Sequence, residues 1–443
     1  MGKYQGYEKY KESGVEWLGD IPNHWKRSIF RYYFDIQLGK MLQNESRTEH
    51  DEEICYLKAI HVRWDKIETD NLPKMWVSPR EKDKYYVKNG DLLISEGGEV
   101  GRTTLLKDLQ EDCIIQNALH RVRSLPESSV EYLNYLMRHI SDTGWLDILC
   151  NKSTIAHLTS EKIAALALPV PPLDEQESIA RFLDRKTSQI DALIAKKTAL
   201  LEKLDEKRTA LISHAVTKGL DSSVPMKDSG VEWLSDIPKH WEIKRLRFLV
   251  VMHGGSTPNK ANPEFWDGEI PWISAKDLKT ERLKSSVDTI TDKALQETSI
   301  HIHPKNGVVI VVRGMILAHS FPVAINDIDI TINQDLKVLR TSQSNEFLAI
   351  LLRGVKNIVL SIMEESGHGT KVLRTDLFKN VELPHPPQVE QGEIVNYVNQ
   401  KTTEIDRQKA KVKEAIELLK EYRTALITNA VTGKIDVRQV GRV

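Results

Sequence analysis

Two long stretches of the chain carry apolar positions in the spacing of an α-helix. Alternating steps of three and four residues, with one extra step of four near the end of each stretch, link these positions, which is the seam of a coiled coil. The first stripe runs through Ile179, Leu183, Lys186, Ile190, Leu193, Lys197, Leu200, Leu204, Arg208, Leu211 and Ala215. The second runs through Ile394, Val398, Lys401, Ile405, Gln408, Val412, Ala415, Leu419, Arg423, Leu426 and Ala430. We predict two long helices that pack against each other.

Two lysines, Lys186 and Lys401, fall on these stripes. Their aliphatic stems can cover the seam while the ammonium groups reach water. Alternatively, they fix the pairing register of the helices or contact another subunit. The pattern leaves both interpretations open.

The segments that precede the helices read as mixed α/β structure with mostly strands. Residues 91–95 and 308–312 follow Asn-Gly turns and have patterns typical of buried strands. Residues 131–140 and 345–360 have amphipathic helical spacing. Each half of the chain is therefore expected to be a strand-rich domain followed by one long helix.

The chain is an internal duplication. Residues 11–25, KESGVEWLGDIPNHW, differ at only three positions from residues 227–241, KDSGVEWLSDIPKHW. Residues 168–221 also match residues 383–436, with more differences. The offset between these two blocks is 215, and the offset between the two copies of the opening motif is 216. Between these blocks the halves diverge strongly. We infer a shared scaffold that carries two different versions of one element.

The charge balance restricts how the protein can bind nucleic acid. The 443 residues include 62 Lys and Arg against 63 Asp and Glu, a formal net charge of −1. A protein that binds DNA unaided is usually basic, because neutralising phosphates supplies much of its affinity. Near-neutral charge therefore weighs against unaided DNA binding.

Cysteine usage and hydropathy indicate a cytoplasmic protein. Cys55, Cys113 and Cys150 show no metal-ligand spacing, which argues for a reducing compartment and against disulfides or a zinc site. The chain contains no apolar run of about eighteen residues, so we predict no membrane span. The N-terminus lacks the apolar core of a signal peptide.

No catalytic site emerges from the motifs. Walker, nucleophile, zinc-protease and adenine-methyltransferase motifs are absent. Asp335-Leu336-Lys337 has a nuclease-like form without a recurring acidic partner, and His301 and His303 are better explained by packing than by metal binding. We predict a non-catalytic protein without metal or cofactor.

At this point the repeated motifs resemble a known family, the specificity subunits of type I restriction–modification enzymes. The resemblance rests on SGVEWL-x-DIP-x-HW, on PPLDEQ and PPQVEQ before the helices, and on RTALI-x-x-AVT at their ends. Residues 57–64, 254–258 and 270–273 also resemble segments of that family's recognition domains. The similarity covers essentially the whole chain.

The resemblance implies an α+β fold in which two α/β target recognition domains, mostly strands, are separated by two long helices in an antiparallel coiled coil with pseudo-twofold symmetry. The implied boundaries are residues 1–167 and 219–382 for the domains, 168–218 and 383–436 for the helices, and 437–443 for a C-terminal tail. The implied partners are double-stranded DNA, two methyltransferase subunits and endonuclease/translocase subunits, with each domain reading half of a split target. The rival hypothesis is a stand-alone DNA-binding protein such as a repressor.

Base reading requires side chains such as Arg, Asn and Gln on loops that can enter a groove. In the first domain the candidates are Lys40, Arg63, Lys66, Arg102, Gln116, Asn117, His120 and Arg121. In the second domain they are Ser256, Thr257, Asn259, Lys260, Lys276, Arg313, Asn333, Gln334 and Lys371. The repeated tryptophans, Trp17, Trp25, Trp233 and Trp241, are instead assigned to packing, because residues shared by both halves cannot read two different sequences.

Overall fold

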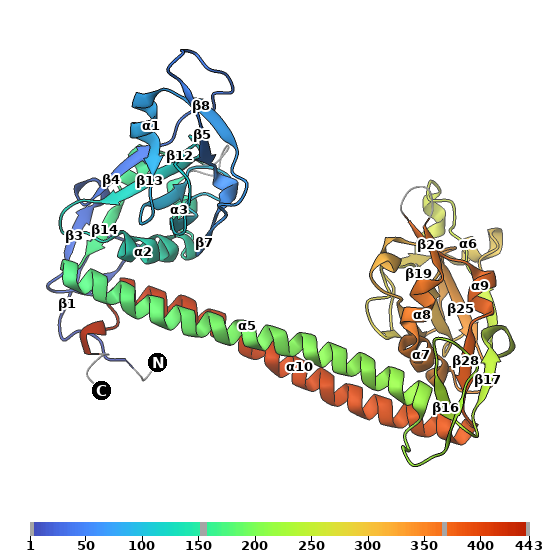
Figure 1. Ribbon diagram of the computed structural model, residues 1–443. Coiled ribbons are helices and arrows are strands. Elements are labelled where there is room, and N and C mark those ends of the chain that lie inside the picture. The colour runs from blue at the N-terminus through green and yellow to red at the C-terminus, as the bar shows by residue number, and fades with distance from the viewer. Residues whose placement is uncertain (1–3, 151–156, 366–369, 440–443) are drawn as a thin grey trace. The chain divides into compact units, whose positions relative to one another are not determined.

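The computed structural model describes residues 4–150, 157–365 and 370–439, and the chain forms two compact units (Figure 1). The first unit comprises residues 1–197 and 414–443, and the second comprises residues 198–413. Both long helices are present, as α5 (Leu173–Lys218) and α10 (Gln388–Val431), which confirms that prediction. Each helix contributes one of its ends to each unit.

Two four-stranded sheets form the body of the first unit, in the orders β11-β10-β13-β4 and β8-β5-β12-β9. Their strands are β4 (Phe34–Leu38), β5 (Glu52–Leu57), β8 (Lys74–Val77), β9 (Tyr86–Val87), β10 (Leu92–Ser95), β11 (Thr103–Leu105), β12 (Cys113–Ile115) and β13 (Leu119–Ser124). Three strand pairs accompany them, made of β1 (Tyr10–Glu12) with β2 (Asp20–Pro22), β3 (Lys26–Ile29) with β14 (Ala167–Val170), and β6 (Val62–Arg63) with β7 (Lys66–Ile67). The shorter helices are η1 (Phe30–Tyr32), η2 (Ala59–His61), α1 (Pro79–Tyr85), α2 (Val130–Asp142), α3 (Trp145–Leu149), α4 (Ser160–Ala164) and η6 (Val437–Gln439).

The second unit contains a five-stranded sheet, β18-β25-β22-β23-β20, and a three-stranded sheet, β21-β19-β24. Their strands are β18 (Val251–Gly254), β19 (Trp266–Ile273), β20 (Arg282–Leu283), β21 (Asp288–Ile290), β22 (Val308–Val311), β23 (Val323–Asn326), β24 (Thr331–Ile332) and β25 (Leu336–Arg340). The strand pairs are β15 (Met226–Asp228) with β16 (Asp236–Pro238), β17 (Glu242–Arg245) with β28 (Glu382–His385), and β26 (Met363–Glu365) with β27 (Lys371–Leu373). The shorter helices are η3 (Leu246–Phe248), η4 (Pro263–Phe265), α6 (Asp292–Glu297), η5 (Met315–Ala318), α7 (Asn345–Gly354), α8 (Lys356–Ser361) and α9 (Thr375–Lys379).

The two units repeat one sheet topology although their sequences diverge. The strand order β23-β22-β25-β18 in the second unit corresponds to β11-β10-β13-β4 in the first. Likewise β21-β19-β24 corresponds to β8-β5-β12, and in both sheets the last two strands run parallel. The predicted mixed structure with mostly strands is confirmed, and the duplication extends through the diverged segments.

The buried-strand predictions are confirmed, whereas one helix prediction is wrong in part. All four residues of β10 and of β22 are buried. The single helix expected over residues 345–360 is instead two helices, α7 and α8, which are separated at Val355. The helix breaks where Gly354 approaches α5, since a Cβ on Gly354 would lie 2.6 Å from Cγ2 of Val216.

Each unit builds its core around the start of one long helix and the end of the other. In the first unit, Ile179 and Leu183 of α5 join Leu426 and Ala430 of α10 in one cluster with the sheet and α2. In the second unit, the roles are exchanged, and the core helical residues are Ile394 and Val398 of α10 and Ile212, Ala215 and Val216 of α5. Full burial of each leucine, isoleucine or valine in these sets contributes roughly 1.5–3 kcal/mol, so neither half of the chain can complete its core alone.

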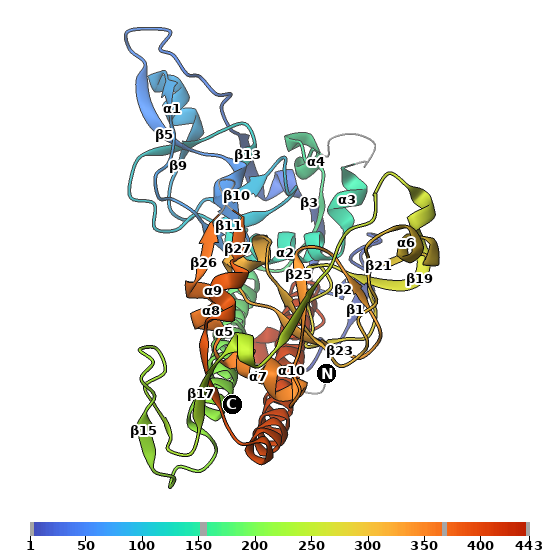
Figure 2. The same cartoon turned by 90° about the vertical axis from the view of Figure 1, so that its right-hand side faces the viewer.

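The two long helices lie side by side (Figures 1 and 2), and ion pairs fix their relative direction in the second unit. In the second unit, Asp205 pairs with Lys409 and Arg208 with Asp406, so residue numbers rise on α5 as they fall on α10. The two helices are therefore antiparallel. In the first unit, Arg423 donates to Asp191 at 3.0 Å, and this pair is the repeat counterpart of Arg208 with Asp406.

The seam predicted from the sequence is wrong by one residue in the middle of each helix. Leu193 and Leu200 point outward, 48% and 43% exposed, and Gln408 is exposed as well. Ile194 packs on the first core instead, and Ile416 is buried. A straight helix has 3.6 residues per turn rather than the 3.5 of an ideal heptad, so a fixed three–four alternation drifts off the contact line.

Lys186 and Lys401 are half-buried on the seam. The side chain of Lys401 is 42% exposed, and its Nζ lies 3.6 Å from Glu404 on the same helix. The residues that follow them, Thr187 and Thr402, are buried. This arrangement favours the interpretation in which the lysine stems cover the seam.

A repeated hydrogen-bond network explains why the opening motif and the helix-start motif occur together. The indole of Trp25 donates to Glu175 at 3.0 Å, and the indole of Trp241 donates to Glu390. The histidine before each tryptophan bonds to the same carboxylate. Both indoles are buried, so the packing role predicted for these tryptophans is confirmed. Trp17 and Trp233 pack against the two cores.

Within the described part of the chain, no helix is both long and apolar enough to cross a membrane. Nor do three or more His, Cys, Asp or Glu side chains of these residues gather as a metal site would require. Cys55, Cys113 and Cys150 are buried free thiols. Near the C-terminus, η6 returns Val437 to the core of the first unit.

Candidate nucleic-acid interface

Three strand ends meet at one edge of the first unit. The amide of Lys40, after β4, donates to the carbonyl of Ile115 at 2.8 Å. Gln116, after β12, donates to Leu57 at the end of β5, and the next amide, Asn117, donates to the carbonyl of Lys40. Main-chain hydrogen bonds thus hold together residues that lie about sixty to eighty positions apart in sequence.

The second unit repeats this arrangement. The amide of Ser256, after β18, donates to Ile332 at 3.0 Å, and Asn333, after β24, donates to Ile273 at the end of β19. A glycine precedes the crossing in each unit because the strands touch there. A Cβ on Gly39 would overlap the carbonyl of Gln116, and one on Gly255 would overlap the carbonyl of Ile332.

A short turn after β5 and after β19 completes each edge. In the first unit, Nδ1 of His61 accepts from the amide of Lys58 at 3.4 Å. In the second unit, Asp277 accepts from the amide of Ser274 at 2.8 Å. The turns therefore present residues 60 and 276 at the same position. We call Lys40, Met41, Ile60, Gln116 and Asn117 the first reader cluster, and Ser256, Thr257, Lys276, Asn333 and Gln334 the second reader cluster.

The first reader cluster exposes apolar side chains beside two amides. Met41 is 75% exposed and Ile60 is 56% exposed, whereas Gln116 and Asn117 are half-buried. Lys40 points inward, and its Nζ donates to Gln43 at 3.0 Å and to Glu81 at 2.6 Å. Burial raises the pKa of the Glu81 carboxyl, but the hydrogen bonds from Lys40 and Ser78 outweigh it and hold the pKa below its usual value. Lys40 therefore anchors the loop from inside.

The second reader cluster is polar throughout. The hydroxyl of Thr257 bonds to the side-chain carbonyl of Gln334, which is exposed. Asn333 is mostly buried, and its side-chain oxygen accepts from the amide of Asp335 at 3.1 Å. Lys276 is exposed and lies 2.6 Å from Asp288. An exposed carboxamide and an exposed ammonium can contact base edges and phosphates respectively.

Two further residues predicted to contact DNA, His120 and Arg121, instead make contacts in the interior of the first unit. His120 is fully buried, and Nε2 bonds to the carbonyl of Leu158 at 2.8 Å. Burial lowers the pKa of His120, which favours its neutral form. Arg121 donates to the carbonyls of Lys84 and Tyr86. With Lys40, these side chains stabilise the fold, and we no longer propose them as base contacts.

Arg63, Lys66 and Arg102 gather at the hairpin of β6 and β7, next to the first reader cluster. Arg102 donates to the carbonyl of Val62 at 2.9 Å and pairs with Glu99, so it supports the hairpin. Arg63 and Lys66 are exposed. The latter two remain candidates for phosphate contacts.

The remaining candidates of the second unit flank its reader cluster. Asn259 and Lys260 are exposed in the loop after β18. Arg313 is exposed and pairs through its backbone with Val372. Lys371 lies beside it and forms a 2.8 Å ion pair with Glu365.

Comparison with known proteins agrees with this architecture. The family described as "Type I restriction modification DNA specificity domain" matches residues 77–203 and 238–418, well over half of the chain. The chain belongs to this specificity family.

Individual relatives show how far the similarity extends. The chain is 30% identical over 199 residues to the type I restriction enzyme MjaIX specificity subunit of Methanocaldococcus jannaschii, a match that covers 43% of this chain and 45% of that protein. It is 22% identical to the putative MjaX specificity subunit of the same organism, over 97% of this chain and 98% of that one. A solved chain from a study of type I restriction–modification assembly has a TM-score of 0.72 at 15% identity, covering 94% of this chain and 99% of that one, and it shares the fold.

The exposed apolar residues of the first reader cluster were missed by sequence reasoning. Met41 follows the predicted Lys40, and Ile60 lies inside the segment 57–64 that resembles specificity-family recognition domains. A search restricted to hydrogen-bond donors passes over them. No local pattern marks them, because Met41 is followed by Leu42 and Ile60 is preceded by Ala59. Their exposure gains meaning only when the strand ends are known to converge.

Proposed function

We propose that the protein is the DNA-recognition subunit of a type I restriction–modification enzyme. The observation that carries the proposal is that both units hold one main-chain framework at the reader clusters and place different side chains on it. A pair of readers with equal geometry and unequal chemistry suits a target made of two different half-sites. We place this activity in the cytoplasm.

The subunit has no catalytic role of its own in this proposal. Two methyltransferase subunits modify the target, and endonuclease/translocase subunits complete the larger complex on double-stranded DNA. The recognition domains correspond to residues 1–167 and 219–382. The near-neutral net charge of −1 supports a division of labour in which partner subunits supply many of the phosphate contacts.

The long helices, residues 168–218 and 383–436, set the separation of the half-sites and dock the methyltransferase subunits. Insertion of one heptad into both helices is expected to lengthen the unread spacer and to leave both half-sites unchanged. Unchanged spacing in a map of methylated sites would remove this part of the proposal.

The central test is a map of methylated adenines in a host that expresses this chain with its methyltransferase subunits. We expect a two-part target. Exchange of the first reader cluster for that of a relative should change one half of the target only. A purified chain that binds one continuous site tightly by itself would instead indicate a repressor.

A further inference from the structure

An exposed aromatic residue next to an arginine occurs at the same place in both units. Tyr32 is 68% exposed and Phe248 is 71% exposed. They follow Arg31 and Arg247, and the offset of 216 is that of the opening motif. Each sits in a one-turn helix, η1 or η3, directly before the first strand of the main sheet. We call these two residues in each unit the arginine–aromatic pair.

The fold presents each pair to solvent. The first residue of the turn, Phe30 or Leu246, is fully buried and anchors it in the core. The guanidinium of Arg247 lies 4.8 Å from the ring centre of Phe248. Among the described residues, neither Arg31 nor Arg247 forms an ion pair. The turn thus holds an aromatic ring and an unpaired cation outside the core.

Two observations argue against DNA as the ligand of this pair. The pair precedes β4, whereas the reader cluster follows it, and a five-residue strand spans about 17 Å. In addition, the pair is alike in both units, so it cannot distinguish two different half-sites. An exposed hydrophobic residue is ordinary when it occurs singly, but its repetition in units that otherwise diverge indicates a partner common to both.

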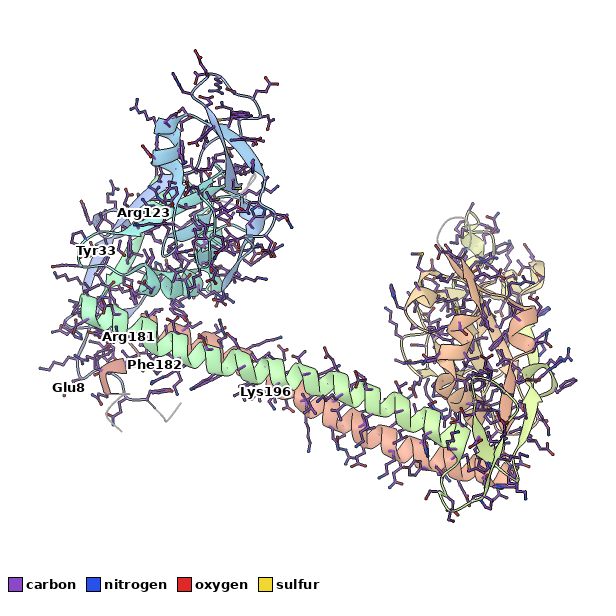
Figure 3. The ribbon with its side chains drawn as sticks, viewed as in Figure 1. Glu8, Tyr33, Arg123, Arg181, Phe182 and Lys196 are labelled. Carbon is purple, nitrogen blue, oxygen red and sulfur yellow. The ribbon has the colours of Figure 1, made fainter. Side chains whose placement is uncertain are left out.

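The surface beside the pair in the first unit contains some residues that both halves share. A hollow of about 290 Å³ is lined by His24, Tyr33, Pro171 and Pro172, among others. Tyr33, labelled in Figure 3, directly follows the pair, and His24 and the two prolines belong to motifs present in both halves. Residues shared by both halves therefore line part of this hollow, although Tyr33 itself is replaced by Leu249 in the second half.

We propose that each arginine–aromatic pair docks one copy of the same partner subunit, which offers an apolar pocket for the ring and a carboxylate for the guanidinium. Aromatic and arginine side chains are the commonest anchors of protein interfaces. This inference rests on the proposed function, in which the partner is the methyltransferase subunit. It adds a contact on the units themselves to the docking assigned to the helices.

The test counts partner subunits on the full chain by native mass spectrometry after co-expression. The wild type is expected to carry two methyltransferase subunits, Tyr32→Ala and Phe248→Ala one each, and the double variant none at concentrations about tenfold above those that saturate the wild type. Val287→Ala, at a site with 68% exposure and no repeated counterpart, is the matched control and should retain two. Arg31→Glu should reproduce the loss of one copy.

The outcomes separate the two proposals. Two partners on the double variant would overturn the docking contact while leaving the proposed function intact. A wild-type chain that binds no methyltransferase subunit would overturn both. A double variant that keeps two partners but loses affinity for DNA would reassign the pair to the nucleic-acid interface. Equal melting temperatures of wild type and variants exclude misfolding as the cause of a loss.

Discussion

At the two reader clusters, the same hydrogen-bonded strand ends carry different side chains. Where the first cluster has Met41 and Ile60, the second has Thr257 and Lys276. The carboxamides also appear in reversed order, Gln-Asn at residues 116–117 and Asn-Gln at residues 333–334. Main-chain hydrogen bonds hold the strand ends together there. The outward side chains can therefore differ without a loss of packing in the core.

The comparison also shows which residues cannot differ. Gly39 and Gly255 are retained because the neighbour of each would-be side chain is a carbonyl group rather than a flexible side chain. The buried anchor Lys40 is replaced by Ser256, and in the second unit the indole of Trp272 donates to the carbonyl of Ser256 at 3.1 Å. Shared geometry therefore depends on backbone contacts, and specificity depends on what projects from them.

The largest effect is expected from disrupting the hydrogen-bonded strand ends that support one reader cluster at a time. Gly255→Val should force the crossing with Ile332 apart and reduce the affinity of the complex for its target about 100-fold, measured by titration of labelled DNA. Gly39→Val should do the same through the first unit. Gly392→Ala is the control, because nothing lies within 4 Å of the added methyl group, and it should bind normally and gain up to about 1 kcal/mol of stability. Normal DNA binding by the Gly255→Val variant would show that the strand ends under the two reader clusters do not play equivalent roles.

The second-largest effect is expected from the pH dependence of stability, to which one buried histidine in each unit contributes. Burial lowers the pKa of His139 in the first unit to about 4, and burial with the neighbouring His253, Arg340 and His301 lowers that of His303 in the second to about 4. Unfolded histidine titrates near 6.5, so the unfolded chain takes up protons first as pH falls. Stability is complete above pH 6.5 and should fall by about 2 kcal/mol per histidine by pH 4.5.

Urea unfolding at pH 7.5 and pH 4.5 measures this loss. Added salt should weaken the contribution of His303, which depends partly on neighbouring cations, and leave that of His139, which depends on burial alone. His139→Gln should remove the salt-independent part. A pH dependence that is unchanged in this variant would contradict the assignment.

The carboxamides offer a more selective test of the clusters. Asn117→Ala and Gln334→Ala occupy equivalent positions, and each should relax discrimination at one base pair, in opposite halves of the target, by about tenfold. Methylation of a library of target variants would reveal the relaxed positions. Gln110→Ala, an exposed amide away from the cluster, should leave the pattern unaltered. Relaxation of both halves by one substitution would mean that the clusters do not read separately.

The smallest expected effect concerns residues 60 and 276, which share a position but differ in chemistry. Ile60→Ala should weaken binding about threefold at any salt concentration, because an apolar contact with a thymine methyl group is not screened. Replacement of thymine by uracil in that half-site should give the same loss in the wild type and none in the variant. Lys276→Ala should instead lower the slope of log affinity against log salt by about 1. Equal salt dependence of the two variants would argue against an apolar contact at residue 60.

Much of the fold was predictable because its cues are local or repeated. The buried strands at residues 92–95 and 308–311 directly follow or adjoin Asn-Gly turns and are mostly apolar, and the long helices lie in sustained periodic stripes. Candidate residues were only partly predictable. Gln116 and Asn333 lie at the converging strand ends, but His120 and Arg121, which look equally suited to base contact, are buried.

By itself, the sequence determined that the protein is a duplication, that each half ends in a long helix, and which family it resembles, since repeated motifs and periodic patterns are readable without knowledge of contacts. Only the tertiary structure decided that the diverged segments share one topology, and that Leu193 gives way to Ile194 on the seam. It also decided which polar side chains face inward. These features depend on hydrogen bonds and packing between residues far apart in the chain, and a local pattern does not record them.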